Sequence, residues 1–148
     1  MKKALELLLC ATMMVGLLAG CGSDAQEGGS GDGDTASAKV AYLTPSLDVP
    51  FWRYVRHGVE DELSKSGIEC VTYDSKDDAN TQMSNAQDAI TKQVDAIVIS
   101  PTDSASCVSV LSLAEESGVP VVICDIGTDS GEYVSYISTD NLAGGKAI

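Results

Sequence analysis

Four short apolar segments of this sequence begin at regular intervals, and an amphipathic segment follows each of the first three. The apolar segments span residues 39–43, 68–73, 96–99 and 119–124, so their starts lie 23 to 29 residues apart. This spacing is typical of β-strands that alternate with α-helices, because a parallel crossover needs about a dozen residues or more. We therefore predict an α/β fold with a doubly wound, mostly parallel sheet and helices on both of its faces.

Each amphipathic segment has signals for a helix. The first is predicted over residues 50–66, and Asp78 and Asp103 can cap the next two by accepting a backbone N–H bond. Gly67 and Gly118 follow the first and third helices, as residues that tolerate a left-handed cap. The residues predicted to face the core are Trp52, Val55, Val59 and Leu63, then Met83, Ala86, Ile90 and Val94, then Cys107, Val108, Leu111 and Ala114.

The fifth unit breaks this rhythm. Only residues 126–132 separate Asp125 from the next strand-like run at 133–137, which is too short for a crossover helix, so we predict a loop. Residues 139–141 then form a cap sequence, and the last helix has no stop signal before Ile148. We expect residues 39–148 to be an incomplete lobe rather than a finished domain.

The first 38 residues have a different composition. Lys2 and Lys3 precede an uncharged run at 7–20, which is too short for a comfortable membrane span and fits a signal peptide. The run ends in Leu-Ala-Gly before Cys21, which resembles the bacterial lipobox. The resemblance implies that the Cys21 thiol is lipidated and that Cys21 becomes the mature N-terminus after cleavage of residues 1–20. An uncleaved anchor helix is the alternative. Residues 21–38, rich in glycine, serine and acidic side chains, are predicted to be a flexible tether.

Charge and residue content exclude several classes of function. Nine Lys and Arg residues against 22 Asp and Glu leave a net charge of −13, which argues against nucleic-acid partners because basic residues must supply phosphate contacts. His57 is the single histidine, and the sequence has no G-x-S-x-G, H-E-x-x-H or Walker A motif. We predict no metal and no cofactor, and an exported enzyme remains a remote alternative.

Polar and aromatic residues gather where the predicted strands end. Ligands of open α/β sheets bind at this carboxyl edge, where loops and helix N-termini meet. Aromatic rings can stack on the C–H face of a sugar, while carboxylates and hydroxyls bond to its hydroxyl groups. The candidate ligand-binding residues are Asp48, Phe51, Trp52, Ser100, Asp125 and Asp140.

Several of these residues also have a structural interpretation. One ring of the Phe51 and Trp52 pair is expected to anchor the first helix against the sheet. Asp140 fits a helix cap and a ligand contact equally well, whereas Asp103 fits a cap better. Asp125 directly follows an apolar strand and has no obvious structural role, so we favour a ligand role for it.

Four segments of the chain resemble one protein family. They are residues 47–52 (LDVPFW), 99–104 (ISPTDS), 121–125 (VVICD) and 138–145 (STDNLAGG). In order and spacing they resemble the type I sugar-binding proteins of bacterial ABC importers, and ribose-binding-protein-like members most closely. The resemblance implies a two-lobed protein, monomeric when complete, that closes on a monosaccharide and delivers it to a membrane permease. It also implies that Phe51 and Trp52 sandwich the sugar and that Asp125 and Asp140 hold its hydroxyl groups.

The resemblance leaves the ligand open. Val49 and Ser100 stand where the family often has asparagine, and Ile126 stands where an arginine usually follows the aspartate. Without these donors, a sugar other than ribose or a less hydroxylated ligand fits equally well. LacI-type repressors share this lobe, but here a signal peptide occupies the place of their DNA-binding segment. A sensory module that reports to a membrane receptor is the alternative to transport.

Overall fold

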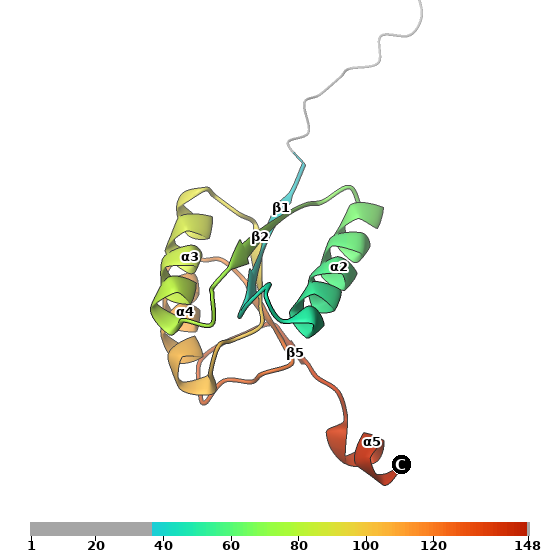
Figure 1. Ribbon diagram of the computed structural model, residues 1–148. Coiled ribbons are helices and arrows are strands. Elements are labelled where there is room, and N and C mark those ends of the chain that lie inside the picture. Colours follow the sequence, from blue (N-terminus) through green and yellow to red (C-terminus); the bar gives the residue numbers. More distant parts are fainter. Residues whose placement is uncertain (1–36, 148) are drawn as a thin grey trace, which may run out of the picture. The chain divides into compact units, whose positions relative to one another are not determined.

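The computed structural model describes residues 37–147, and this part of the chain alternates strands and helices (Figure 1). The predicted signal peptide, Cys21 and most of the tether lie outside these residues. The elements are β1 (Lys39–Thr44), α2 (Pro50–Lys65), β2 (Glu69–Asp74), α3 (Ala79–Thr91), β3 (Ala96–Ile99), α4 (Ser104–Glu116), β4 (Val121–Cys124), β5 (Ser135–Ile137) and α5 (Asn141–Lys146).

The five strands form one parallel sheet in the order β2-β1-β3-β4-β5. Figure 1 shows α2 on one face of the sheet and α3 and α4 on the other. The predicted doubly wound α/β fold is therefore confirmed. β1 pairs with β2 on one edge and with β3 on the other, so the order of the strands along the sheet reverses at β1. In such sheets the loops after the strands diverge at this point and leave room for a ligand.

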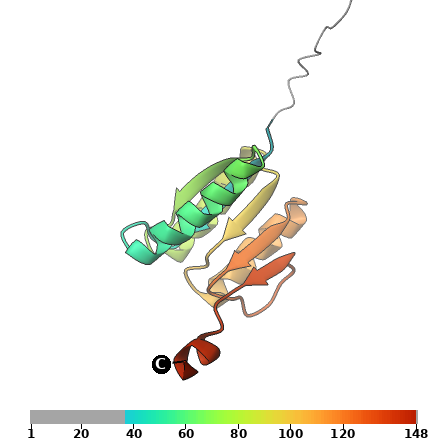
Figure 2. The same cartoon turned by 90° about the vertical axis from the view of Figure 1, so that its right-hand side faces the viewer.

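The main hydrophobic core fills the space between the sheet and helices α3 and α4. Its members are Ala41, Leu43, Ala86, Ala89, Val94, Ile97, Ile99, Cys107, Val110, Leu111, Ala114, Val121 and Ile123. The opposite face is covered less completely, since α2 packs on β1 and β2 while β4 and β5 lie open beside it (Figure 2). Val122 and Cys124 on that face are consequently only half-buried.

Some residues predicted to face the core are not fully buried. In α4 the fully buried residues are Cys107, Val110, Leu111 and Ala114, whereas Val108 is half-buried. The buried set follows the i, i+3, i+4, i+7 spacing of one helix face, and Val108 lies about 100° away from Cys107 around the helix axis. In α2 only Trp52 is buried, whereas the predicted core residues Val55, Val59 and Leu63 are half-buried.

The predicted helix ends are confirmed in detail. Asp78 accepts a hydrogen bond from the backbone N–H of Thr81, at 2.6 Å, and caps α3. Asp103 accepts from Ser106 N–H at 2.8 Å and caps α4. Both glycines after the helices, at 67 and 118, have a φ of 69°.

Two strands begin two residues later than the sequence pattern suggests, and β2 begins one residue later, at Glu69. β4 begins at Val121 rather than 119, because the N–H of Val119 still bonds to the carbonyl of Ala114 in the last turn of α4. β5 begins at Ser135 rather than 133. These shifts shorten both strands at the edge away from the candidate site.

The predicted loop between β4 and β5 is confirmed, and it is held against α4. The N–H of Asp129 donates to the carbonyl of Ser104 at 3.1 Å. Gly131 has a φ of 106° and lies so close to α4 that a β-carbon there would meet the Leu111 side chain at 2.9 Å. Glycine is therefore required at this position by both conformation and space.

Gly131→Ala should lower the free energy of unfolding by about 2 to 4 kcal/mol, because a positive-φ penalty adds to overpacking against Leu111. Gly118→Ala is the matched control, since Gly118 has positive φ but no atom within 4 Å of the added carbon. Its cost should be about 1 to 2 kcal/mol. Urea unfolding of both variants measures the difference, and equal costs would show that the loop can move away from α4.

Candidate functional site

The loop after β1 is built by hydrogen bonds that hold it at the carboxyl edge. The carboxylate of Asp74, at the end of β2, accepts from the N–H of Leu47 at 3.2 Å and from the N–H of Lys76 at 3.0 Å. Partial burial opposes ionisation of Asp74, but its bonds with Lys76 and Leu47 outweigh burial and lower its pKa. Arg53 of α2 donates from Nη1 to the carbonyl of Leu47 at 3.0 Å. These hydrogen bonds fix the position of the loop that leads into α2.

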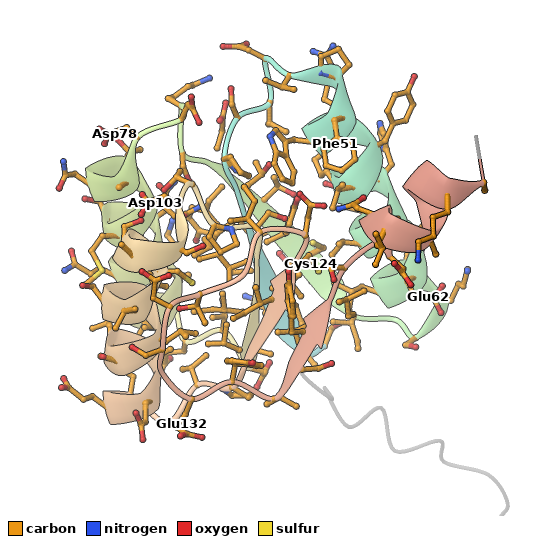
Figure 3. All side chains as sticks on the ribbon, turned by 90° about the horizontal axis from the view of Figure 1, so that it is seen from below. Phe51, Glu62, Asp78, Asp103, Cys124 and Glu132 are labelled. Atoms are coloured by element: carbon orange, nitrogen blue, oxygen red, sulfur yellow. The ribbon has the colours of Figure 1, made fainter. Side chains whose placement is uncertain are left out.

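A pocket of about 210 Å³ opens at the carboxyl edge between α2, β4 and β5. It is lined by Phe51, Val55, Cys124, Asp125, Ile137, Ser138 and Thr139. Figure 3, which views the molecule from below the view of Figure 1, labels Phe51 on α2 and Cys124 at the end of β4. The pocket walls are mostly apolar, with a carboxylate and two hydroxyl groups, which suits a ligand with an apolar face and hydroxyl groups.

The two predicted aromatic residues have different environments. Phe51 is 50% exposed and lines the pocket, whereas Trp52 is 9% exposed. Their ring centroids are 4.8 Å apart and the planes meet at 72°, an edge-to-face arrangement. Trp52 is thus the ring that anchors α2 to the sheet, and Phe51 is the ring available to a ligand.

Asp125 has an unusual backbone conformation. Its φ is 69°, in the left-handed region that residues with a β-carbon seldom adopt. Its N–H donates to the carbonyl of Ile137 at 2.8 Å, which continues the pairing of β4 with β5 by one residue. The chain turns sharply here, so that Asp125 lies at the pocket with Cys124.

The predicted residue Ser100 lies below the surface. It is fully buried, and its hydroxyl is 3.1 Å from the hydroxyl of Tyr42 in β1. The carbonyl of Ser100 accepts from the side-chain amide of Gln82 at 3.0 Å. Burial raises the pKa of Tyr42, although the bond to Ser100 opposes this, so the pair is uncharged at neutral pH. Ser100 is therefore an interior residue that does not line the pocket.

The remaining predicted residues, Asp48 and Asp140, do not line the pocket either. Asp48 is exposed in the loop before α2. Asp140 is exposed and caps α5, accepting from the N–H of Ala143 at 2.8 Å. The structure therefore brings two of the six candidates, Phe51 and Asp125, into one pocket.

Five further residues that were not among the predicted site residues also line this pocket. Val55 was assigned to the core because its spacing matches the buried stripe, and it is half-buried beside the pocket. Ser138 and Thr139 directly follow β5, so the rule that ligands bind at strand ends could have included them. Ile137 belongs to an apolar run and gave no signal of its own.

The cysteines of the described part of the chain are free thiols. Burial raises the pKa of each, to about 11 for Cys107, and for Cys124 the nearby carboxylate of Asp125 adds to the effect. All three are protonated at neutral pH and are poor nucleophiles. Residues 37–147 contain no cluster of metal-ligating side chains and no helix long and apolar enough to cross a bilayer.

A larger cavity, of about 370 Å³, lies at the opposite edge of the sheet, between the end of α4 and the start of β5. Its lining includes Glu115, Pro120, Glu132 and Tyr133. Ligands of parallel α/β sheets bind at the carboxyl edge, and this cavity lies at the amino edge. Size alone therefore does not make it the better candidate.

Residues 40–148 match the model of the periplasmic binding protein domain family. The chain belongs to this family. It is 30% identical to the ribose import binding protein RbsB of Bacillus subtilis over 148 residues, covering 99% of this chain and 48% of that relative. It is 31% identical to RbsB of Escherichia coli over 111 residues, covering 75% and 38%.

Solved structures with the same fold include proteins bound to a polyol or a sugar. The myo-inositol binding protein of Caulobacter, bound to myo-inositol, is 29% identical with a TM-score of 0.67, over 74% of this chain and 37% of that chain. A periplasmic ribose ABC transporter protein from Conexibacter woesei is 25% identical with a TM-score of 0.71, over 79% and 40%. The chain thus spans about half or less of the length of these relatives.

Proposed function

We propose that this chain is the N-terminal lobe of an extracytoplasmic solute-binding component of an ABC importer, which captures a monosaccharide or a similar small polar ligand. The observation that supports this most is the placement of Phe51 and Asp125 in one pocket at the carboxyl edge of the sheet. Membership of the family and the names of the relatives supply the ligand class and the role in import.

The chemistry of the pocket fits such a ligand. The exposed ring of Phe51 offers an apolar face to the C–H groups of a sugar, and the Asp125 carboxylate can accept bonds from two adjacent hydroxyl groups. Ser138 and Thr139, which follow β5, add hydroxyl groups to the wall of the pocket. A second lobe would cover the opposite face of the sugar, exclude water and so strengthen every polar contact.

The ligand itself is proposed to differ from ribose or to be less hydroxylated. Ser100, at a position where the family often has asparagine, has its hydroxyl bonded to Tyr42 inside the lobe. Val49 is 44% exposed in the loop before α2 and brings no hydrogen-bond donor in its side chain. Ile126 is half-buried after Asp125 and offers no cation to a ligand. These three replacements reduce the number of directional donors.

Isothermal titration calorimetry of the full-length protein tests this proposal. The panel should contain D-ribose, D-allose, D-apiose, D-glucose and myo-inositol, which the names of relatives suggest. We expect at least one to bind with micromolar or tighter affinity. Failure of every neutral sugar and polyol to bind would contradict the proposal.

We also propose that Cys21 is lipidated and anchors the protein on the outer side of the cytoplasmic membrane. The apolar run before Cys21 supports this, as does the tether after it. Cys21→Ser should abolish incorporation of labelled palmitate. Cys10→Ser is the control, since Cys10 lies in the predicted signal peptide. Retention of the label in Cys21→Ser would exclude this anchor.

A further inference from the structure

The backbone of Asp125 needs support from outside its own strand. A residue with a β-carbon at a φ of 69° costs about 1 to 2 kcal/mol relative to ordinary backbone. Such conformations persist only where neighbouring groups hold them, and they are common at ligand sites. The contacts of the Asp125 peptide groups therefore identify what fixes the conformation.

Both peptide groups of Asp125 are bonded to β5. Its N–H donates to the carbonyl of Ile137 at 2.8 Å. Its carbonyl accepts a hydrogen bond from the side-chain hydroxyl of Tyr136 at 2.7 Å. The Tyr136 ring reaches this carbonyl across Gly127, where an added β-carbon would lie 3.5 Å from the Tyr136 hydroxyl oxygen.

Tyr136 supports Asp125 from the side away from the pocket. Tyr136 pairs with Ile123, a member of the core beneath α3 and α4, and paired residues of parallel strands point to the same face. Ile137, the next residue, lines the pocket on the α2 side. Tyr136 therefore does not touch a ligand in the pocket and can affect binding only through Asp125.

We propose that Tyr136 is a positioning residue. Its hydroxyl donates to the Asp125 carbonyl, stabilises the left-handed backbone conformation of Asp125, and so keeps the Asp125 carboxylate in place for the ligand. The inference rests on the proposed sugar-binding function of this pocket. It assigns a role in affinity to a half-exposed residue of an edge strand that has no contact with the ligand.

Tyr136→Phe in the full-length protein tests the inference, because it removes only the hydroxyl. Using the tightest-binding sugar of the calorimetric panel as probe, we expect the dissociation constant to rise about tenfold, the equivalent of one net hydrogen bond. The melting temperature should change by less than about 3 °C. Tyr133→Phe is the matched control, since Tyr133 is 45% exposed against 44% for Tyr136 and lies at the opposite edge of the sheet. It should bind as the wild type does.

A double-mutant cycle with Asp125→Asn separates positioning from a general structural role. If Tyr136 acts through Asp125, Tyr136→Phe should weaken binding much less in the Asp125→Asn background than in the wild type. Additive losses, or an unchanged dissociation constant in Tyr136→Phe alone, would overturn the inference and leave the proposed function standing. Absence of sugar binding by the wild type would overturn both.

Discussion

Asp125→Ala is expected to weaken sugar binding by the full-length protein at least about 100-fold while leaving its melting temperature nearly unchanged. Hydrogen bonds to a charged acceptor are worth about 1.5 to 3 kcal/mol each, and the carboxylate has room to accept two. Asp125 is half-buried, and the hydrogen bonds that join it to β5 are made by its backbone rather than its carboxylate. Calorimetry and thermal unfolding of the same preparation measure both effects.

Asp129→Ala is the control for this prediction. Asp129 lies on the same loop, is exposed, and bonds to α4 through its backbone N–H rather than its carboxylate. Its removal changes the net charge equally and should leave the affinity unchanged. A large loss of stability in Asp125→Ala would show that this residue is structural, and an equal loss of affinity in both variants would point to a long-range charge effect.

We expect Trp52 to contribute mainly to the stability of the fold and Phe51 mainly to sugar binding. Trp52→Ala is expected to lower the free energy of unfolding by about 3 to 5 kcal/mol, because it empties a buried site between α2 and the sheet. Phe51→Ala should cost only about 1 kcal/mol in stability, since half of its surface is already in water. It should instead weaken sugar binding about tenfold, through loss of stacking in the pocket.

Urea unfolding and calorimetry on both variants check this division. Phe51→Leu keeps an apolar side chain without the planar ring, so it separates stacking from simple burial. It should retain the stability of the wild type and lose most of the affinity that Phe51→Ala loses. Equal destabilisation by Phe51→Ala and Trp52→Ala would contradict the assignment of Trp52 as the anchor.

Much of the fold could be predicted from local patterns. The strand at 96–99 was predicted from its apolar run, and its bounds were correct, although Ala96 and Val98 on the α2 face are only half-buried. The caps at Asp78 and Asp103 were predictable because a side-chain oxygen before a helix satisfies a backbone donor within three residues. The loop between β4 and β5 followed from its length alone.

The site could be predicted less completely, because its details depend on tertiary packing. Neighbours in sequence, Phe51 and Trp52 differ in exposure since helix rotation places one ring over the sheet and the other at the pocket. Ser100 and Asp125 both directly follow a strand. The Ser100 side chain is nevertheless buried, with its hydroxyl bonded to that of Tyr42. The hydrogen-bond partners of the left-handed Asp125 backbone lie on β5, and the local sequence around Asp125 gives no signal for them.

A crystal structure of the full-length protein with its tightest-binding sugar tests the central claim most directly. The account predicts the sugar ring against the face of Phe51, with two hydroxyl groups bonded to the carboxylate of Asp125 and a second lobe closed over the opposite face. A sugar bound at the opposite edge of the sheet, near Tyr133, or one held without contact to Asp125, would contradict the account.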